Sequence, residues 1–448
     1  MTDSDAVPSG RPLTAGGDEP VALPAAIAGL TIASVLRQGA FHADAALVVG
    51  VVASVVLGVG LVKGAAGIRP AVGALGALVA WWLVSAVTHG RAASFLPLGA
   101  SMVGFASALV CMRRLGPRGR QLAAGGLVGI GTASAAAGLV AEAFRLFPVA
   151  ARAQNVWRVS TTLNYANAGG LLLGMALLVA FSLDKRLGRL SVCLCAAGLV
   201  ATQSRGAVLS TFLALCLVPL ANLARARWAL AVGVAAGLAV VSMSRGDGLR
   251  WGDLAVVMVA AALALVAPAA GGGPSQRRLP RRLRVVVAGV GLAAVGVAGL
   301  ALRGYIARRL NQDRLPEWSA AVDQWRSALL TGVGPDKPLV LEAATRTTAS
   351  FAHSEYLQVL AGSGIIGGVL LAGTALALAS CIRRRDALSS CAAAAVVAFG
   401  LAGGVDFVWH LPALGLLGGW AAGLAALPTA GSAPDPAGLS AGNISGAL

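Results

Sequence analysis

Polar residues at positions 353–356 open an otherwise apolar run, AHSEYLQVLAGSGIIGG, and their types could carry out acid–base chemistry. A helix N-terminus carries a partial positive charge that favours a bound phosphate. The same field disfavours an imidazolium and so leaves a neutral imidazole able to accept a proton. His353 is therefore the candidate general base or acceptor-orienting group, Glu355 is the rival base, and Tyr356 shares the His353 face of a helix. The plain alternative is an interfacial histidine satisfied by water.

The elements that position these residues are membrane spans. The 448 residues are 57% hydrophobic and 12% charged, with a mean hydropathy of +0.79. A soluble domain carries about 25% charged residues. This chain could not cover its surface in water, so its composition predicts an all-α polytopic membrane protein.

A span needs about 20 apolar residues, which predicts about 12 to 14 transmembrane helices here. The candidates are residues 21–36, 44–62, 71–88, 94–112, 121–141, 166–183, 190–203, 206–222, 229–244, 252–270, 285–302, 354–381, 387–404 and 410–427. We expect a disordered cytoplasmic tail (1–20), an N-terminal bundle (21–302), a large extracytoplasmic loop with short helices (303–353), C-terminal helices (354–427) and a disordered tail (428–448).

The net charge of +17 favours a membrane interpretation over nucleic-acid binding, because Lys and Arg concentrate in cytoplasmic loops. Alternate short loops are rich in Arg, near residues 113–120, 185–189, 225–227, 277–284 and 383–385. The opposite side then receives residues 142–165, 203–205, 245–250, 303–351 and 405–410, and all four histidines. We therefore place the active surface on the extracytoplasmic side of the membrane.

The large loop contains a second helix candidate at residues 315–330. Trp318 and Trp325 recur on one face, as in a helix that lies in the headgroup region, although a loop helix packed on the protein fits equally. The following turn, GVGPDK at 332–337, is either an ordinary turn or an anion-binding nest. Further along, Gly364-x-x-x-Gly368 permits close approach of a neighbouring helix.

The run from His353 resembles the signature of the O-antigen ligase/polymerase superfamily of bacterial membrane proteins. Other stretches agree in the family's order between about 165 and 415: NYANA at 164–168, TQSRG at 202–206, RLPEW at 314–318 leading into GVGP at 332–335, and DFVWHLPA at 406–413. Ser354, where many ligases have Asn, and the Asp406 element favour polymerase-like members.

The resemblance implies a membrane glycosyltransferase that joins a glycan carried on undecaprenyl pyrophosphate to an acceptor sugar hydroxyl, with inversion. It assigns Arg205 and Arg314 to the pyrophosphate, because an Arg guanidinium stays charged and binds phosphate oxygens in pairs. Arg308 and Arg309 are rivals of Arg314. Further substrate contacts are expected from Asn164, Tyr356, Asp406 and His410.

No outer Asp-x-Asp pair or His/carboxylate set has metal-site spacing, so we expect no metal and no cofactor beyond the lipid-linked substrate. The implied partners are that substrate, an acceptor glycan or lipid, membrane lipids and a polysaccharide chain-length regulator. The main alternative is a transporter or flippase for a lipid-linked sugar, and a non-catalytic scaffold is a third possibility. A transporter would place charges at mid-span, whereas these polar groups gather at one face.

Overall fold

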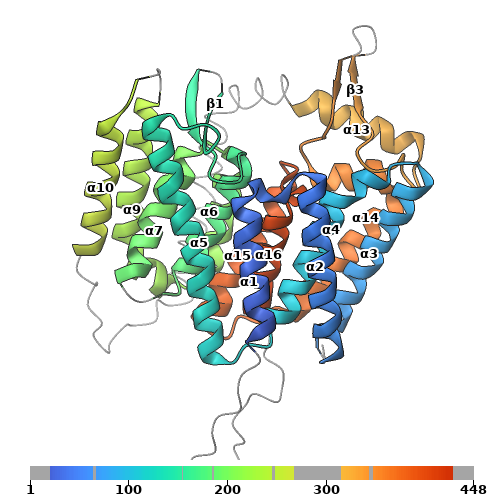
Figure 1. Cartoon of the computed structure of the whole chain (residues 1–448), viewed down its shortest axis with the longest axis horizontal. Helices are drawn as coiled ribbons and strands as arrows, with labels where there is room; N and C mark the ends of the chain where they lie inside the picture. The colour runs from blue at the N-terminus through green and yellow to red at the C-terminus, as the bar shows by residue number, and fades with distance from the viewer. Residues whose placement is uncertain are drawn as a thin grey trace, which may run out of the picture.

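The computed structural model describes residues 21–63, 67–153, 155–183, 186–244, 248–266, 314–342 and 347–426. The expected tails, the span at 285–302 and the rivals Arg308 and Arg309 lie outside these ranges. Helices dominate the described chain, and Figure 1 shows them as one bundle with two small hairpins at one end. The prediction of an all-α polytopic membrane protein is confirmed.

Within these ranges, six helices are long and apolar enough to cross a membrane. They are α2 (Ala43–Val62), α3 (Arg69–Thr88), α4 (Ala92–Met112), α5 (Pro117–Phe144), α9 (Leu220–Met243) and α14 (Glu355–Cys381). Shorter helices are α1 (Ala22–Leu36), α6 (Ala166–Ala180), α7 (Arg186–Ala201), α8 (Arg205–Ala214), α10 (Trp251–Val266), α13 (Leu315–Ser327), α15 (Ala387–Gly403) and α16 (Pro412–Ala425). Short 3-10 turns are η1 (Gln38–Ala40), η2 (Leu215–Leu217) and η4 (Val408–His410).

The centre of the bundle consists of α6, α15 and α16, whose side chains are almost all buried. Small residues make this packing possible, because they let helix backbones approach closely. A Cβ at Gly419 would lie 2.1 Å from the carbonyl oxygen of Phe105 on α4. Helices α2, α3 and α9 lie outside this centre and turn large apolar side chains outward, as spans in lipid do.

One predicted boundary is wrong. The span expected at 206–222 ends earlier, and Arg225 and Arg227, expected in a loop, are helical. The elements α8 and η2 end by Leu217, Pro219 precedes the first residue of α9, and both arginines lie in the first turns of α9. Proline is favoured at such a helix start, and long Arg side chains can reach out of the apolar layer toward water.

The helix α14 is broken at Gly364, which has φ +66° and ψ −165°. Residues of the outer loop satisfy the freed backbone groups. The N–H groups of Val333 and Gly334 donate to the carbonyls of Ala361 and Gly362, and the N–H groups of Ile365 and Ile366 donate to those of Leu329 and Leu330. Gly364 therefore contacts the loop, not a neighbouring helix as expected, and the turn at 332–337 docks on α14 with the amides of residues 332–334 engaged.

Two antiparallel hairpins, which the sequence analysis did not anticipate, complete the fold. They are β1 (Ala150–Ala153) with β2 (Val156–Val159), and β3 (Leu339–Glu342) with β4 (Thr347–Ala349). Both lie at the same end of the bundle, together with α13 (Figure 1). The helix α13 packs on α14 and β3, with Ala320 and Ala321 buried and Trp318 and Trp325 half-buried.

The opposite end carries the Arg-rich turns. Arg114 donates to the carbonyl of Gly60, Arg120 pairs with Asp386 at 3.7 Å, and Arg384 donates to the carbonyl of Leu217. The polar segments predicted to share the other side do lie together: Trp157 bonds to Ser244, Arg250 to Ala143, and Gln203 to Trp157. Within the described residues, the basic turns therefore lie apart from the varied polar loops; the basic loop at 277–284 lies outside the described residues.

Candidate active site

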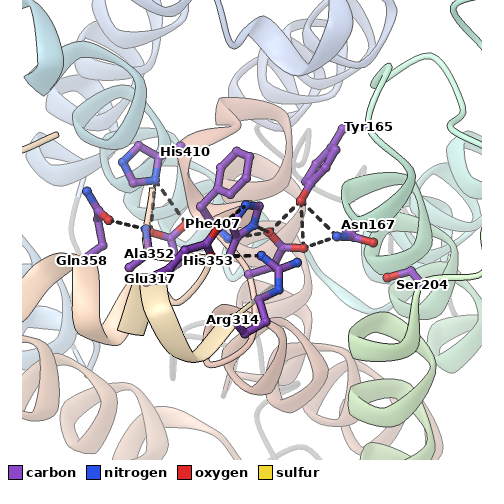
Figure 2. A network of polar contacts seen from close by, with 12 residues as sticks. Tyr165, Asn167, Ser204, Arg314, Glu317, Ala352, His353, Gln358, Phe407 and His410 are labelled. Atoms are coloured by element: carbon purple, nitrogen blue, oxygen red, sulfur yellow. Dashed lines mark hydrogen bonds and ion pairs between the residues drawn. The ribbon is translucent and has the colours of Figure 1, made fainter. Parts of the chain in front are cut away.

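Asp406 is the centre of a polar network at the hairpin end of the bundle. Figure 2 shows its partners Tyr165, Asn167 and His353 gathered in one place. It follows α15, and its carboxylate is almost fully buried. Its oxygens accept hydrogen bonds from Tyr165 Oη at 2.7 and 2.9 Å, from Asn167 Nδ2 and from the N–H of Phe407 at 2.8 Å. Its Oδ1 also lies 3.1 Å from Nδ1 of His353.

His353 stands just before α14, not within it. Its φ of +48° is left-handed, and Ser354 caps the helix by accepting from the N–H of Leu357 at 3.5 Å. This backbone turns the imidazole toward Asp406. Phe407 meets the ring edge-on at 5.0 Å, and the side chain keeps 25% of its surface exposed. His353 is therefore oriented at Nδ1 and accessible.

The other ring nitrogen of His353 faces Glu317 on the first turn of α13. Nε2 lies 3.9 Å from Glu317 Oε1, and Arg314 Nη1 lies 3.6 Å from Glu317 Oε2. Figure 2 shows Arg314 and Glu317 pointing into the network beside His353. We call Asp406, His353 and Glu317 the accessible cluster, in which one imidazole lies between two carboxylates.

Two further arginines approach from the other side. Arg205 is exposed at the first position of α8. Arg158, on β2, donates from Nε to the carbonyl of Thr202 at 2.8 Å and from Nη2 to Asn167 Oδ1 at 3.4 Å. Burial lowers the pKa of Arg158 and Arg205 lowers it further, while Tyr165 and Asp406 raise it. Such adjacent guanidinium groups favour an anion between or beside them.

Helix N-termini reinforce the positive field. The helices α6, α8, α13 and α14 all begin at residues of this network or directly beside them. Each start presents N–H groups and the positive end of a helix dipole. Burial and the charge of Asp406 also raise the pKa of Tyr165 well above its ordinary value, so the phenol remains a hydrogen-bond donor. The arrangement suits a bound anion beside an oriented imidazole.

A second histidine lies in a different setting. His410 is fully buried, with Nδ1 3.0 Å from Glu355 Oε2 and Nε2 3.4 Å from Asp336 Oδ1. Burial lowers its pKa, but the charges of Glu355 and Asp336 and the hydrogen bonds to them outweigh burial and raise the pKa to about 10. We call Glu355, His410 and Asp336 the buried cluster. His410 therefore has no exposed surface that could contact a sugar, contrary to the sequence prediction. The Glu355 carboxylate is already paired with His410.

The sequence matches the O-antigen ligase family over residues 190–372, a range that contains Arg205, Arg314 and His353. The match supports membership of the O-antigen ligase/polymerase superfamily. No curated protein matches the chain.

Two of the predicted substrate contacts, Tyr356 and Asn164, lie apart from the Asp406 network. Tyr356 donates its Oη to the carbonyl of Gly400 at 2.6 Å and packs edge-on against Trp409. It lines an apolar cavity of about 620 Å³ among α3, α4, α14 and α15. Asn164 adopts a left-handed turn with φ +56°, and its N–H donates to the carbonyl of Thr161. It is Asn167, not Asn164, that bonds to Asp406.

Sequence reasoning missed Glu317, Arg158, Tyr165 and Asn167. Glu317 carried a usable signal, since it lies three residues after Arg314 and so shares its helical face. Tyr165 and Asn167 stood in a stretch already singled out. Arg158 had no signal, because its hairpin was not predicted.

In the part of the chain the structure describes, no group of three His, Cys, Asp or Glu residues could hold a metal ion. Metal independence stays a prediction.

Proposed function

We propose that this protein transfers or polymerises a glycan carried on undecaprenyl pyrophosphate, using an acceptor sugar hydroxyl at the outer face of the inner membrane. The observation that carries the proposal is the accessible cluster. It holds one imidazole in a fixed orientation, leaves one ring nitrogen reachable, and stands among Arg side chains and helix N-termini. Together these groups match the two needs of the reaction, a base and a site for a leaving diphosphate.

His353 is the proposed general base. Asp406 accepts a hydrogen bond from the Nδ1–H of His353, which leaves the lone pair of Nε2 available. Nε2 takes the proton of the acceptor hydroxyl, and the oxygen of that hydroxyl attacks the anomeric carbon of the donor sugar. The bond from that carbon to the diphosphate oxygen breaks, and the diphosphate leaves with the electron pair. Attack opposite the leaving group inverts the anomeric centre, and no metal is required in this scheme.

Arg205 and Arg314 are proposed to bind the diphosphate, with Arg158 as a third cation on the Arg205 side. Their charge offsets the negative charge that develops on the leaving group. We propose that the polyprenyl chain lies in the apolar cavity lined by Tyr356 and Trp409. This cavity begins beside the first turn of α14 and follows the helix as far as Leu378. A chain-length regulator is a proposed partner.

The decisive experiment uses the purified chain in bilayer discs with a synthetic undecaprenyl-pyrophosphate oligosaccharide. His353→Ala should lower product formation by about 10²- to 10⁴-fold, the usual contribution of a general base. The variant should reach the membrane and unfold at the wild-type temperature. The proposal fails if the wild type forms no longer glycan, and movement of the lipid between leaflets would favour the flippase alternative.

A further inference from the structure

A buried group of two acids and an arginine, which the proposed mechanism does not use, lies where the outer ends of α5 and α10 meet. Glu142 in the last turn of α5 is fully buried, Arg145 directly after α5 has 6% of its side chain exposed, and Asp253 in the first turn of α10 is 1% exposed. The N–H of Arg250 donates to the carbonyl of Ala143 and so brings the two helix ends together. Buried charges are costly unless they are paired and hydrogen-bonded.

Arg145 satisfies only one of the two acids. Its left-handed backbone, with φ +57°, turns the guanidinium back toward α5, where Nη1 donates to Glu142 Oε1 at 2.5 Å and to the Glu142 carbonyl at 2.9 Å. Glu142 Oε2 and both carboxylate oxygens of Asp253 are buried and accept no hydrogen bond within the described structure. The charges of Arg145 and Arg250 act on Asp253, but neither side chain donates to it. These three buried oxygens therefore lack a donor.

A proton between the two acids supplies that donor. The carboxyl groups of Glu142 and Asp253, which we call the acid pair, face each other within hydrogen-bonding reach. A carboxylate only accepts hydrogen bonds, whereas a protonated carboxyl group also donates one. Two ionised carboxylates in such a site repel each other, and one shared proton removes this repulsion. The charged groups beside the acid pair are Arg145 from α5 and Arg250 next to α10, and β2 contributes the uncharged ring of Trp157.

The same arginine also contacts the hairpin that carries Arg158. The Cζ atom of Arg145 lies 5.5 Å from the ring centroid of Trp157, which is a cation–π arrangement. Trp157 directly precedes Arg158 on β2, and Arg158 is the third cation of the proposed diphosphate site. A continuous set of contacts therefore leads from the acid pair through Arg145 and Trp157 to Arg158.

We propose that Glu142 and Asp253 share one proton, and that the protonated acid pair holds Arg145 against Trp157 and thereby positions Arg158. The proton joins α5 to α10 through a hydrogen bond between the two carboxyl groups. These acids and Arg145 are positioning residues, because they contact one another and the hairpin. The shared proton stands independently of any reaction, whereas its effect on Arg158 rests on the proposed transfer reaction.

The shared proton gives the pH dependence a definite sign. Ordinary Asp and Glu side chains lose their protons at about pH 3.9 and 4.3. Above this range the folded protein keeps a proton that the unfolded chain has released, so its stability falls as the pH rises. Asp253→Asn keeps a donor toward Glu142 and has no shared proton to release. The unfolding temperature of Asp253→Asn minus that of the wild type should therefore grow with pH.

Infrared spectroscopy of the full chain in bilayer discs detects the proton directly. A protonated carboxyl group has a C=O stretching band that is separate from the bands of a carboxylate. The wild type should show this band at neutral pH, and both Asp253→Asn and Glu142→Gln should lose it. Asp323→Asn is the matched control, because Asp323 lies at the same end of the protein with its side chain 68% exposed, and it should leave the band unchanged.

Binding of undecaprenyl pyrophosphate tests the link to Arg158. Asp253→Ala removes one member of the acid pair and should weaken this binding about 10- to 100-fold, as expected for losing one hydrogen bond to a charged group. In a protein that already has Arg158→Ala, the same change should weaken binding no further. Asp253→Asn should bind the lipid like the wild type, because it keeps the hydrogen bond to Glu142.

Three results would each overturn the inference. The first is a protonated-acid band that persists in Asp253→Asn, and the second is an unfolding temperature of this variant that follows the wild type at every pH. The third is that the losses in lipid binding from Asp253→Ala and Arg158→Ala add. None of these measurements requires a glycosidic bond to form, so a wild type without transfer activity would overturn the proposed function alone.

Discussion

The accessible and buried clusters are built from the same residue types and differ in their surroundings. Each has one imidazole between two carboxylates: His353 between Asp406 and Glu317, and His410 between Glu355 and Asp336. The exposed fraction of the histidine side chain is 25% in the first cluster and 0% in the second. Burial, and not residue type, therefore divides the candidate chemistry from the structural role.

The buried cluster fixes the backbone that carries the accessible one. It joins Asp336 of the outer loop to the first residue of α14 and to η4. Nearby, Gln358 accepts from the N–H of Ala352, the residue before His353, at 3.0 Å and donates to Asp336. Because a left-handed histidine backbone needs support from its surroundings, this second cluster stabilises the orientation on which the first depends.

The largest effect that would test this division comes from Asp406. Asp406→Asn keeps the shape but can donate to His353, which would move the ring proton and occupy Nε2. We expect transfer to fall about 10²- to 10⁴-fold with little change in the unfolding temperature. Product formation per folded molecule measures the loss of transfer. Retention of more than a tenth of wild-type activity would contradict the proposed orientation of His353.

The converse test is His410→Gln. Removing the imidazole leaves the buried carboxylate of Glu355 and the partly buried one of Asp336 without a cation, which should cost about 3–5 kcal/mol of folding free energy. Thermal unfolding in detergent measures this loss, and His42→Gln is a control because His42 is exposed and outside both clusters. Transfer per folded molecule should change far less than in His353→Ala. Equal losses in the two variants would remove the distinction between the clusters.

The pH dependence of stability sharpens the same comparison. The pKa of His410 is raised from 6.5 to about 10 by its carboxylate partners. Its contribution is therefore fully present below pH 6.5 and is lost as the pH rises toward 10. The unfolding temperature should fall across this window in the wild type and fall less in His410→Gln. The same slope in both proteins would show that His410 is not the responsible group.

The smallest effect is expected at Tyr165. Tyr165→Phe removes one donor to Asp406, and Asn167 and the N–H of Phe407 remain. A hydrogen bond to a charged group contributes about 1.5–3 kcal/mol, so transfer should fall no more than about 100-fold. Initial rates with the lipid-linked oligosaccharide measure this. A loss as large as that in Asp406→Asn would mean that Tyr165 itself contacts the substrate.

The described fold was largely predictable because membrane spans are encoded locally. An apolar run of fixed length predicts a helix regardless of its partners, and each predicted span within the described ranges overlies a helix. The break at Gly364 was not predictable. The residue is compatible with a helix by sequence, and only the loop that docks on it makes the left-handed turn favourable.

The sequence by itself determined that His353, Arg205, Arg314 and Asp406 share one end of a helical membrane protein, because hydropathy and the placement of basic loops are local properties. Only the tertiary structure decided their roles. It placed Asp406 against Nδ1 of His353 and brought in Glu317, while it buried His410 and turned Tyr356 toward an apolar cavity. Exposure and hydrogen-bond partners arise from contacts between residues distant in the chain. The polar run at 353–356 therefore divides into one accessible imidazole and one buried carboxylate, a difference that its residue types alone do not contain.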